Sequence, residues 1–264
     1  MPPARQVVVP GGGWLTVYEQ AGSGPTLVLL HGFTDHALSY RLLLPHLAGR
    51  HVVIPDLRGH GLSGRAPITS LDDFCRDVEA MAAELRLGTV TLVGHSMGAM
   101  IAVQLAARAK IKVGALVTLS GSLAPASAAL ATVAAQFATL PYPVPMDHPF
   151  LDEWYACRRL VPEAFLLPLR KSCVEMRRED WTACLAVLQR ADLREVARRV
   201  TAPCLVIGGE DDPLFPESHQ VTLAGFLPNA ERVNLSGVGH NPHWELPKAV
   251  AERLLHFEHA AIAA

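Results

Sequence analysis

The pentapeptide from residue 94 to residue 98 constrains this chain more than any other feature. Its sequence is Gly94-His95-Ser96-Met97-Gly98; it directly follows the apolar run Val90–Val93 and opens the alanine-rich stretch Met97–Ala109. A chain that turns sharply from a strand into a helix leaves almost no room beside the central residue, which accounts for the flanking glycines. The pattern predicts a strand-turn-helix unit that presents the Ser96 hydroxyl above a sheet, near the positive end of the helix dipole.

Apolar runs that recur along the chain predict the rest of this sheet. Continuous apolar runs are typical of strands that helices cover on both faces. They lie at Thr26–Leu30, Val52–Ile54, Val90–Val93, Ala115–Leu119, Leu205–Ile207 and Arg232–Leu235. A hairpin at one edge of the sheet is predicted from Val7–Val9 and Trp14–Glu19, which flank a turn at Gly11–Gly13.

Helical patterns separate the strands. Ser70-Leu71-Asp72-Asp73 resembles a capping box, and apolar side chains then recur every three or four residues up to Leu85. Met97–Ala109 is predicted to be a helix buried nearly all round, and Pro247 suits the first turn of a final helix. The predicted inner face of that helix holds Val250, Leu254 and Phe257. Strand alternating with helix predicts an α/β fold, with a mostly parallel central sheet and helices on both faces.

The segment from residue 122 to residue 200 interrupts this alternation. It contains several helical stretches and the proline-rich passage Pro141–Pro145, but no convincing strand. We therefore expect residues 1–121 and 201–264 to form one core domain, and residues 122–200 to form a helical cap inserted into it.

Composition excludes several classes of protein. Half of the 264 residues are apolar and 18% are charged, which fits an enzyme with a buried core rather than a disordered chain. The net charge is −2 and the basic residues form no stripe, so no nucleic-acid partner is expected. No apolar run approaches the roughly 20 residues of a membrane helix and no signal peptide is evident, so we expect a cytoplasmic protein without membrane contact. The five cysteines include no C-x-x-C pair and are expected to be free thiols.

The pentapeptide in its strand-to-helix context resembles the α/β-hydrolase family, and the resemblance extends along essentially the whole chain. It is supported by His31-Gly32-Phe33, which closes the run Thr26–Leu30, and by residues 55–63, which resemble a structural loop of that family. The resemblance implies that Ser96 is a nucleophile. It also implies an oxyanion hole formed by the backbone N–H groups of Phe33 and Met97. No cofactor is implied.

The acid of such a site occupies one of two positions in the family, each after a core strand. The first position holds Ser120-Gly121-Ser122, which contains no carboxylate, and the second holds the acidic loop Gly209–Pro216. The spacing usual in the family selects Asp212. Asp211 and Glu210 remain alternatives. The carboxylates that do not serve as the acid are expected to bond the loop backbone or to face water.

The base is expected after the acid, because the family order is Ser, acid, His. His240 ends the Gly-rich loop Ser236–His240 and resembles the histidine of the family. His243 is expected at the mouth of the pocket, and His95 in a packing or supporting role. Solvated positions are expected for His219, His256 and His259. The twelve histidines and five cysteines form no metal-binding pattern, so no metal is expected.

These residues predict a serine hydrolase that cleaves carboxylic esters or lactones through an acyl-enzyme intermediate. The expected partner is a small ester or lactone with an apolar acyl part, in a pocket built from Phe137, Trp154, Trp181, Leu214, Phe215 and His243. Alternatives are hydrolysis of a C–C bond in ring-cleavage products, acyl transfer to an acceptor other than water, including peroxide, and ligand reception by a retained hydrolase fold. Physiological substrate and oligomeric state are not predicted.

Overall fold

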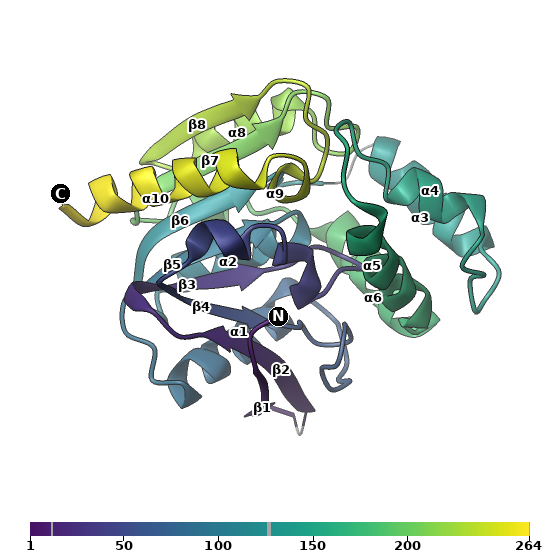
Figure 1. Cartoon of the computed structure of the whole chain (residues 1–264), viewed down its shortest axis with the longest axis horizontal. Helices are drawn as coiled ribbons and strands as arrows, with labels where there is room; N and C mark the ends of the chain where they lie inside the picture. Colours follow the sequence, from purple (N-terminus) through teal and green to yellow (C-terminus); the bar gives the residue numbers. More distant parts are fainter. Residues whose placement is uncertain (12, 126–127, 264) are drawn as a thin grey trace.

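Every predicted apolar run forms a strand, and the strands join into one eight-stranded sheet (Figure 1). The computed structural model describes residues 1–11, 13–125 and 128–263, so the middle residue of the predicted Gly11–Gly13 turn lies outside the described residues. The strands are β1 (Ala4–Val9), β2 (Gly13–Gln20), β3 (Ser23–Leu30), β4 (Arg50–Pro55), β5 (Val90–His95), β6 (Val113–Leu119), β7 (Cys204–Gly209) and β8 (Ala230–Leu235).

The sheet is antiparallel at one edge and parallel elsewhere, in the order β1-β2-β4-β3-β5-β6-β7-β8. β1 and β2 form the predicted hairpin, β2 pairs antiparallel with β4, and the remaining pairs are parallel. The predicted α/β fold is therefore confirmed. β3 lies between β4 and β5, and Leu30 of β3 is the register partner of Gly94 in β5. The chain first adds β4 on one side of β3 and then adds β5 on the other side. The carboxyl ends of β3 and β5 therefore border a topological switch point, where sheets of this kind bind ligands.

Alternating side chains divide the core between the two faces of the sheet. In β3, Val28 and Leu30 belong to the cluster that contains the apolar side chains of α1, α2 and α8. Leu27 and Leu29 belong to the cluster on the opposite face, under η1, η2 and α10. These helices are α1 (Leu71–Glu84), α2 (Met97–Arg108), α8 (Glu217–Phe226), η1 (Ala37–Tyr40), η2 (Leu44–Leu47) and α10 (Pro247–Ala263).

Local sequence signals set the first turns of two of these helices. The Asp73 carboxylate accepts a hydrogen bond of 3.0 Å from the Ser70 N–H, as the predicted capping box requires. Pro247 begins α10, whose predicted inner face is buried. The residues of that face are Val250, Leu254 and Phe257.

The described part of residues 122–200 is helical and contains no strand. Its helices are α3 (Ala128–Thr139), α4 (Pro149–Trp154), α5 (Glu163–Glu175), α6 (Arg178–Arg190) and α7 (Arg194–Ala197). Figure 1 shows α3 to α6 grouped beyond the carboxyl ends of the parallel strands. The short helix α7 instead packs against α2 and α8, which lie on the sheet.

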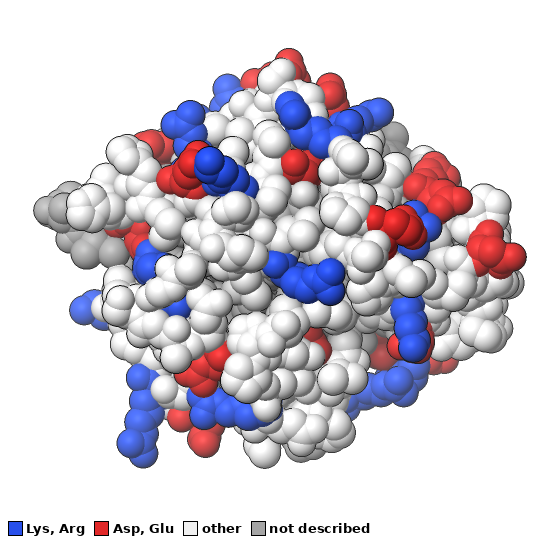
Figure 2. All heavy atoms as spheres, viewed as in Figure 1, with Lys and Arg blue, Asp and Glu red and all other residues white. Residues whose placement is uncertain are grey.

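The surface mixes charges of both signs. Figure 2 shows acidic and basic side chains interspersed on the visible face, without a stripe of one sign. No helix among the described residues is both long enough and apolar enough to cross a bilayer. All five cysteines are free thiols, as predicted, and four of them are buried.

Candidate active site

Ser96 forms the turn between β5 and α2 by itself. β5 ends at His95 and α2 begins at Met97, which leaves Ser96 with φ 52° and ψ −115°. A Cβ atom on Gly94 would lie 2.2 Å from the carbonyl oxygen of Gly98, and one on Gly98 would lie 2.1 Å from that of Leu30. Both glycines are therefore required by close backbone contacts, and the turn holds the serine hydroxyl clear of the sheet.

The structure brings Ser96, His240 and Asp212 into one hydrogen-bonded chain. His240 Nε2 lies 3.0 Å from Ser96 Oγ, and His240 Nδ1 lies 2.8 Å from Asp212 Oδ2. Asp212 follows β7, and His240 follows β8, so the carboxyl ends of three parallel strands supply the three side chains. With Nδ1–H donated to the carboxylate, Nε2 is left to accept the serine proton.

Asp212 is held as a buried anion. It is 3% exposed, and its Oδ1 accepts hydrogen bonds of 2.9 Å from the N–H groups of Leu214 and Phe215. Burial alone would raise the pKa of the Asp212 carboxyl, but the His240 ring and these hydrogen bonds hold the pKa below its ordinary value. The alternative carboxylates, Asp211 and Glu210, are both exposed, and the carboxylate that bonds His240 Nδ1 is that of Asp212.

Two backbone segments meet beside Ser96. Met97 is the first residue of α2, so its N–H has no acceptor within the helix. Gly32 and Phe33 follow β3, and a Cβ atom on Gly32 would lie 3.3 Å from Ser96 Cβ. The N–H groups of Met97 and Phe33, which the family resemblance implies as oxyanion donors, thus belong to segments that flank the serine.

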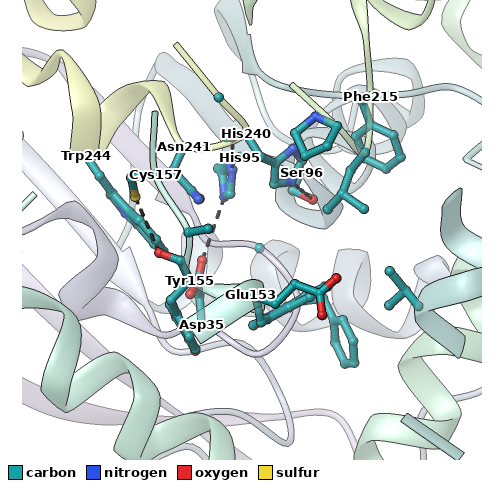
Figure 3. A pocket seen from close by; sticks show the side chains of 18 of the residues that line it. Asp35, His95, Ser96, Glu153, Tyr155, Cys157, Phe215, His240, Asn241 and Trp244 are labelled. Atoms are coloured by element: carbon teal, nitrogen blue, oxygen red, sulfur yellow. Dashed lines mark hydrogen bonds and ion pairs between the residues drawn. The ribbon is translucent and has the colours of Figure 1, made fainter. Parts of the chain in front are cut away.

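The Ser96 and His240 side chains border a cavity of about 350 Å³ (Figure 3). Three of the residues predicted for the pocket line it: Trp154 of α4, Leu214 and Phe215. Apolar side chains of α3 and α6 contribute further wall, namely Leu130, Val133 and Leu188.

Phe137 and Trp181 are not part of the lining. Both rings are buried behind the wall, and Phe137 packs against Phe33, Trp154 and Trp181 with ring centroids 4.8–5.4 Å apart. Phe137 belongs to α3 and Trp181 to α6, and the contact between these two rings is part of the packing of α3 against α6. The two rings thus stabilise the helices that carry part of the cavity wall.

The expectation that His243 lies at the pocket mouth is wrong. Its side chain is fully buried, with its ring 5.0 Å from that of Tyr40 and 4.5 Å from that of His95. His243 belongs to α9 (Pro242–Glu245), and this short turn directs the ring into the core under the site. His219 also differs from the expectation, since it is half-buried and its ring bonds Ser122 Oγ; His256 and His259 are exposed as expected.

His95 supports the loop that carries His240. Its Nε2 lies 2.9 Å from the backbone carbonyl oxygen of His240, and burial lowers the pKa of the ring to about 3. The ring is therefore neutral and donates its Nε2–H to that carbonyl. This agrees with the predicted supporting role of His95, which also borders the cavity.

Glu245 connects the same loop to the helical segment. Its Oε1 accepts a hydrogen bond from the Gly239 N–H, and its Oε2 accepts from the N–H groups of Arg158 and Arg159, all at 3.0 Å. The Arg159 guanidinium donates in addition to the carbonyl groups of Ser236 and Gly237. Nothing in the sequence pattern distinguishes Glu245 from an ordinary helix-end glutamate.

Several cavity residues were not predicted. They include Asp35, Cys157, Asn241 and Trp244. Asp35 and Asn241 stand two residues after Phe33 and directly after His240, so proximity in the chain to predicted site residues was the one available signal.

Comparison with known proteins places the chain in a family. Residues 27–253 match the model of the alpha/beta hydrolase family. The chain is 31% identical over 268 residues to the dihydrolipoyllysine-residue acetyltransferase component of an acetoin cleaving system from Pseudomonas putida, covering 97% of this chain and 69% of that protein. It is 30% identical over 247 residues to a pimeloyl-[acyl-carrier protein] methyl ester esterase from Nitrosomonas europaea, covering 87% and 94%.

A solved structure shares the fold. The enol-lactonase from Burkholderia xenovorans superposes with a TM-score of 0.82 at 22% identity, covering 96% of this chain and 99% of that chain. The family match over most of the sequence and the parallel sheet agree: the chain belongs to the alpha/beta hydrolase family.

Proposed function

We propose that this protein is a serine hydrolase that cleaves carboxylic esters or lactones through an acyl-enzyme intermediate. One observation carries the proposal: the hydrogen-bonded chain Ser96–His240–Asp212 borders a largely apolar cavity. A nucleophile, a base and a group that orients the base are thus within reach of a bound carbonyl compound.

In the proposed reaction, Ser96 Oγ attacks the substrate carbonyl while His240 Nε2, 3.0 Å away, takes the hydroxyl proton. Asp212 keeps Nδ1 protonated and stabilises the imidazolium that forms. The low pKa of Asp212 supports this role, because the carboxylate stays ionised beside the ring. His240 then gives the proton to the leaving alkoxide, and a water molecule activated by His240 releases the acid.

The proposed oxyanion hole consists of the Met97 and Phe33 N–H groups. Charge builds on the carbonyl oxygen during attack, and the positive end of the α2 dipole lies at the same point. Donors on fixed backbone need no reorientation during the reaction, which makes this arrangement suited to stabilising the tetrahedral intermediate.

We propose further that residues 122–200 act as a cap that closes the acyl pocket. Side chains from α3, α4 and α6 form part of the cavity wall, and these include Leu130, Val133, Trp154 and Leu188. An apolar wall suits a small substrate with an apolar acyl part. The name of the Nitrosomonas europaea relative, a methyl ester esterase, supports ester cleavage.

The experiment compares the purified protein with its Ser96→Ala variant on p-nitrophenyl esters of increasing acyl length and on several lactones. We expect multiple turnovers by the wild type, reduced on the order of 10³- to 10⁶-fold in the variant. Equal turnover by both proteins would exclude Ser96 as the nucleophile. Absence of turnover on every ester and lactone would exclude the proposed function and favour cleavage of a C–C bond or ligand reception.

A further inference from the structure

The cavity around Ser96 has two chemically different sides. Figure 3 shows Phe215 on one side of Ser96, and Asp35, Tyr155 and Asn241 on the other. The wall that Phe215 shares with Leu214 is apolar and suits the acyl part in the proposed function. The other side carries polar groups that the proposed mechanism does not use.

Asp35 is the carboxylic acid on this polar side. It belongs to the loop that follows β3, lines the cavity, and is only 4% exposed. Among the described residues, its carboxyl group lies near the His95 ring, which is neutral, and accepts no backbone hydrogen bond. Asp35 Oδ2 and His95 Nδ1 are 3.8 Å apart, which is too far for a direct hydrogen bond.

A second polar atom without a partner lies next to the Asp35 carboxyl, namely Nδ1 of His95. Its Nε2–H is donated to the His240 carbonyl oxygen, so Nδ1 of the neutral ring is a hydrogen-bond acceptor. Nδ1 is buried and has no hydrogen-bond partner among the described residues. Nδ1 is sealed from the cavity and, at 3.8 Å from Asp35 Oδ2, does not satisfy the Asp35 carboxyl, so a hydrogen-bond partner for that carboxyl has to come from the cavity.

Asn241 adds a second polar side chain to the cavity wall. It directly follows His240, lines the cavity and is 6% exposed. Its backbone carbonyl accepts from α9, but its side-chain amide forms no hydrogen bond with any other residue that the structure describes. The amide can therefore both donate to and accept from a bound molecule.

We propose that Asp35 and Asn241 form a subsite that hydrogen-bonds a hydroxyl group of the substrate. The substrate class is thus a hydroxy-substituted ester or lactone, with its apolar part against Phe215. This inference rests on the proposed hydrolase function and narrows it.

The electrostatic surroundings favour a neutral hydroxyl over a cationic ammonium group. Burial raises the pKa of the Asp35 carboxyl to about 8, so the group keeps its proton near neutral pH. The titratable groups that interact with it bring no positive charge, because His95 is neutral and the others are Tyr40, Tyr155 and Cys173. A protonated carboxyl both donates and accepts, as a hydroxyl partner requires.

The test uses two pairs of substrates in which a hydroxyl replaces a methyl group of equal size. In the first pair the hydroxyl lies in the acyl part: p-nitrophenyl 3-hydroxybutyrate against p-nitrophenyl 3-methylbutyrate. In the second it lies in the alcohol part: 2-hydroxyethyl butyrate against propyl butyrate. The ratio of kcat/KM within each pair is measured for the wild type, Asp35→Leu, Asn241→Leu and the control Asp147→Leu, which removes an exposed carboxyl outside the cavity.

We expect the wild type to prefer the hydroxy member of at least one pair by about tenfold or more, since sites built around a hydroxyl reject analogues that lack it. Asp35→Leu and Asn241→Leu should each bring that ratio close to one, because they lower kcat/KM for the hydroxy member more than for the methyl member. The control should keep the wild-type ratio.

Two outcomes would overturn the inference. They are a wild-type ratio near one in both pairs, and a ratio that is unchanged in both leucine variants, whether or not activity on both members falls. Both outcomes leave the proposed hydrolase intact, provided that Ser96→Ala abolishes turnover of the methyl esters. If one leucine variant loses activity on both members of a pair, its thermal unfolding shows whether the variant is folded. The kcat/KM ratio of the other variant then decides whether the subsite exists. A wild type that hydrolyses no member of either pair refutes the subsite, and the panel of p-nitrophenyl esters and lactones then decides whether the hydrolase proposal stands.

Discussion

The His95 ring donates a hydrogen bond of 2.9 Å to the backbone carbonyl of His240. This bond joins the last residue of β5, directly before the proposed nucleophile, to the loop that carries the proposed base. His95 therefore stabilises the distance between the proposed nucleophile and the proposed base without taking part in the proposed proton transfer.

Replacing His95 by alanine should reduce kcat more than it changes KM. The substitution removes the bond to the His240 loop and leaves a cavity among packed rings, so stability should fall by on the order of 3 kcal/mol. His95→Gln retains a donor and should recover part of the lost kcat. Steady-state kinetics with urea unfolding provides the check, and a wild-type kcat in folded His95→Ala would refute the supporting role.

Buried neutral histidines should make the fold sensitive to acid. Burial lowers the pKa of His36 and of His60 to about 4. The unfolded chain binds their protons near pH 6.5, so their contribution to stability is complete above pH 6.5 and is lost as the pH falls toward 4. Each of the two histidines should lower the free energy of unfolding by on the order of 2 kcal/mol as the pH falls from 6.5 to 5.

The variant His60→Gln isolates this effect. Because glutamine does not titrate, the difference in free energy of unfolding between wild type and variant should shrink as the pH falls from 6.5 to 5. Burial raises the pKa of Asp35 to about 8 and that of Asp56 to about 6. These two carboxyl groups stabilise the folded protein as the pH falls and so oppose the effect of the histidines. Their contribution is the same in wild type and variant and therefore cancels in the difference. A difference that is constant with pH would contradict a buried neutral His60.

Loss of the Glu245 carboxylate should damage stability and turnover together. Glu245→Ala leaves three backbone N–H groups without their acceptor, those of Gly239, Arg158 and Arg159. Each unpaired buried donor costs about 1–3 kcal/mol where water does not reach it. A matched control is Glu252→Ala, which removes an exposed glutamate of α10. Equal urea midpoints and equal kcat for the two variants would argue against the anchoring role.

Gly98 should not tolerate a methyl group. In Gly98→Ala the new Cβ would meet the Leu30 carbonyl oxygen at 2.1 Å, and backbone atoms cannot move aside without separating β3 from α2. We expect a loss of about 3 kcal/mol or more. Gly88→Ala is the control, because its Cβ meets nothing within 4 Å and its stability should stay within about 0.5 kcal/mol. Comparable melting temperatures for the two proteins would contradict the close contact.

The sequence predicts the central sheet and the three-residue chain at Ser96 because these depend on local signals. Continuous apolar runs identify the parallel strands, and the strand-turn-helix context of Ser96 fixes its place at a strand end. Asp212 and His240 then follow from chain order and family spacing, since parallel strands bring their carboxyl ends to one edge.

The pocket was harder to predict because the direction of a loop or cap side chain depends on packing between distant segments. His243 lies three residues from His240, yet the α9 turn buries it in the core. Phe137 and Trp181 are aromatic residues of the expected segment, but they fill the contact between α3 and α6 instead of the cavity. No periodicity distinguishes Asp35 from an ordinary loop carboxylate.

The pairing of β6 with β7 has a consequence for how this chain can diversify. The two strands are parallel neighbours, so the chain leaves the carboxyl end of β6 and must cross back to the amino end of β7 at the opposite edge of the sheet. Helix α7, which packs against α2 and α8, lies in the last part of this crossover, whereas α3 to α6 are grouped beyond the carboxyl ends of the parallel strands (Figure 1). The part before α7 can therefore change in length or sequence without altering strand register, because closing a longer loop costs little. Ser96, Asp212 and His240 all lie outside the segment, while much of the pocket wall lies within it. Exchange of this one segment would therefore change which molecules fit while the proposed reacting groups stay in place.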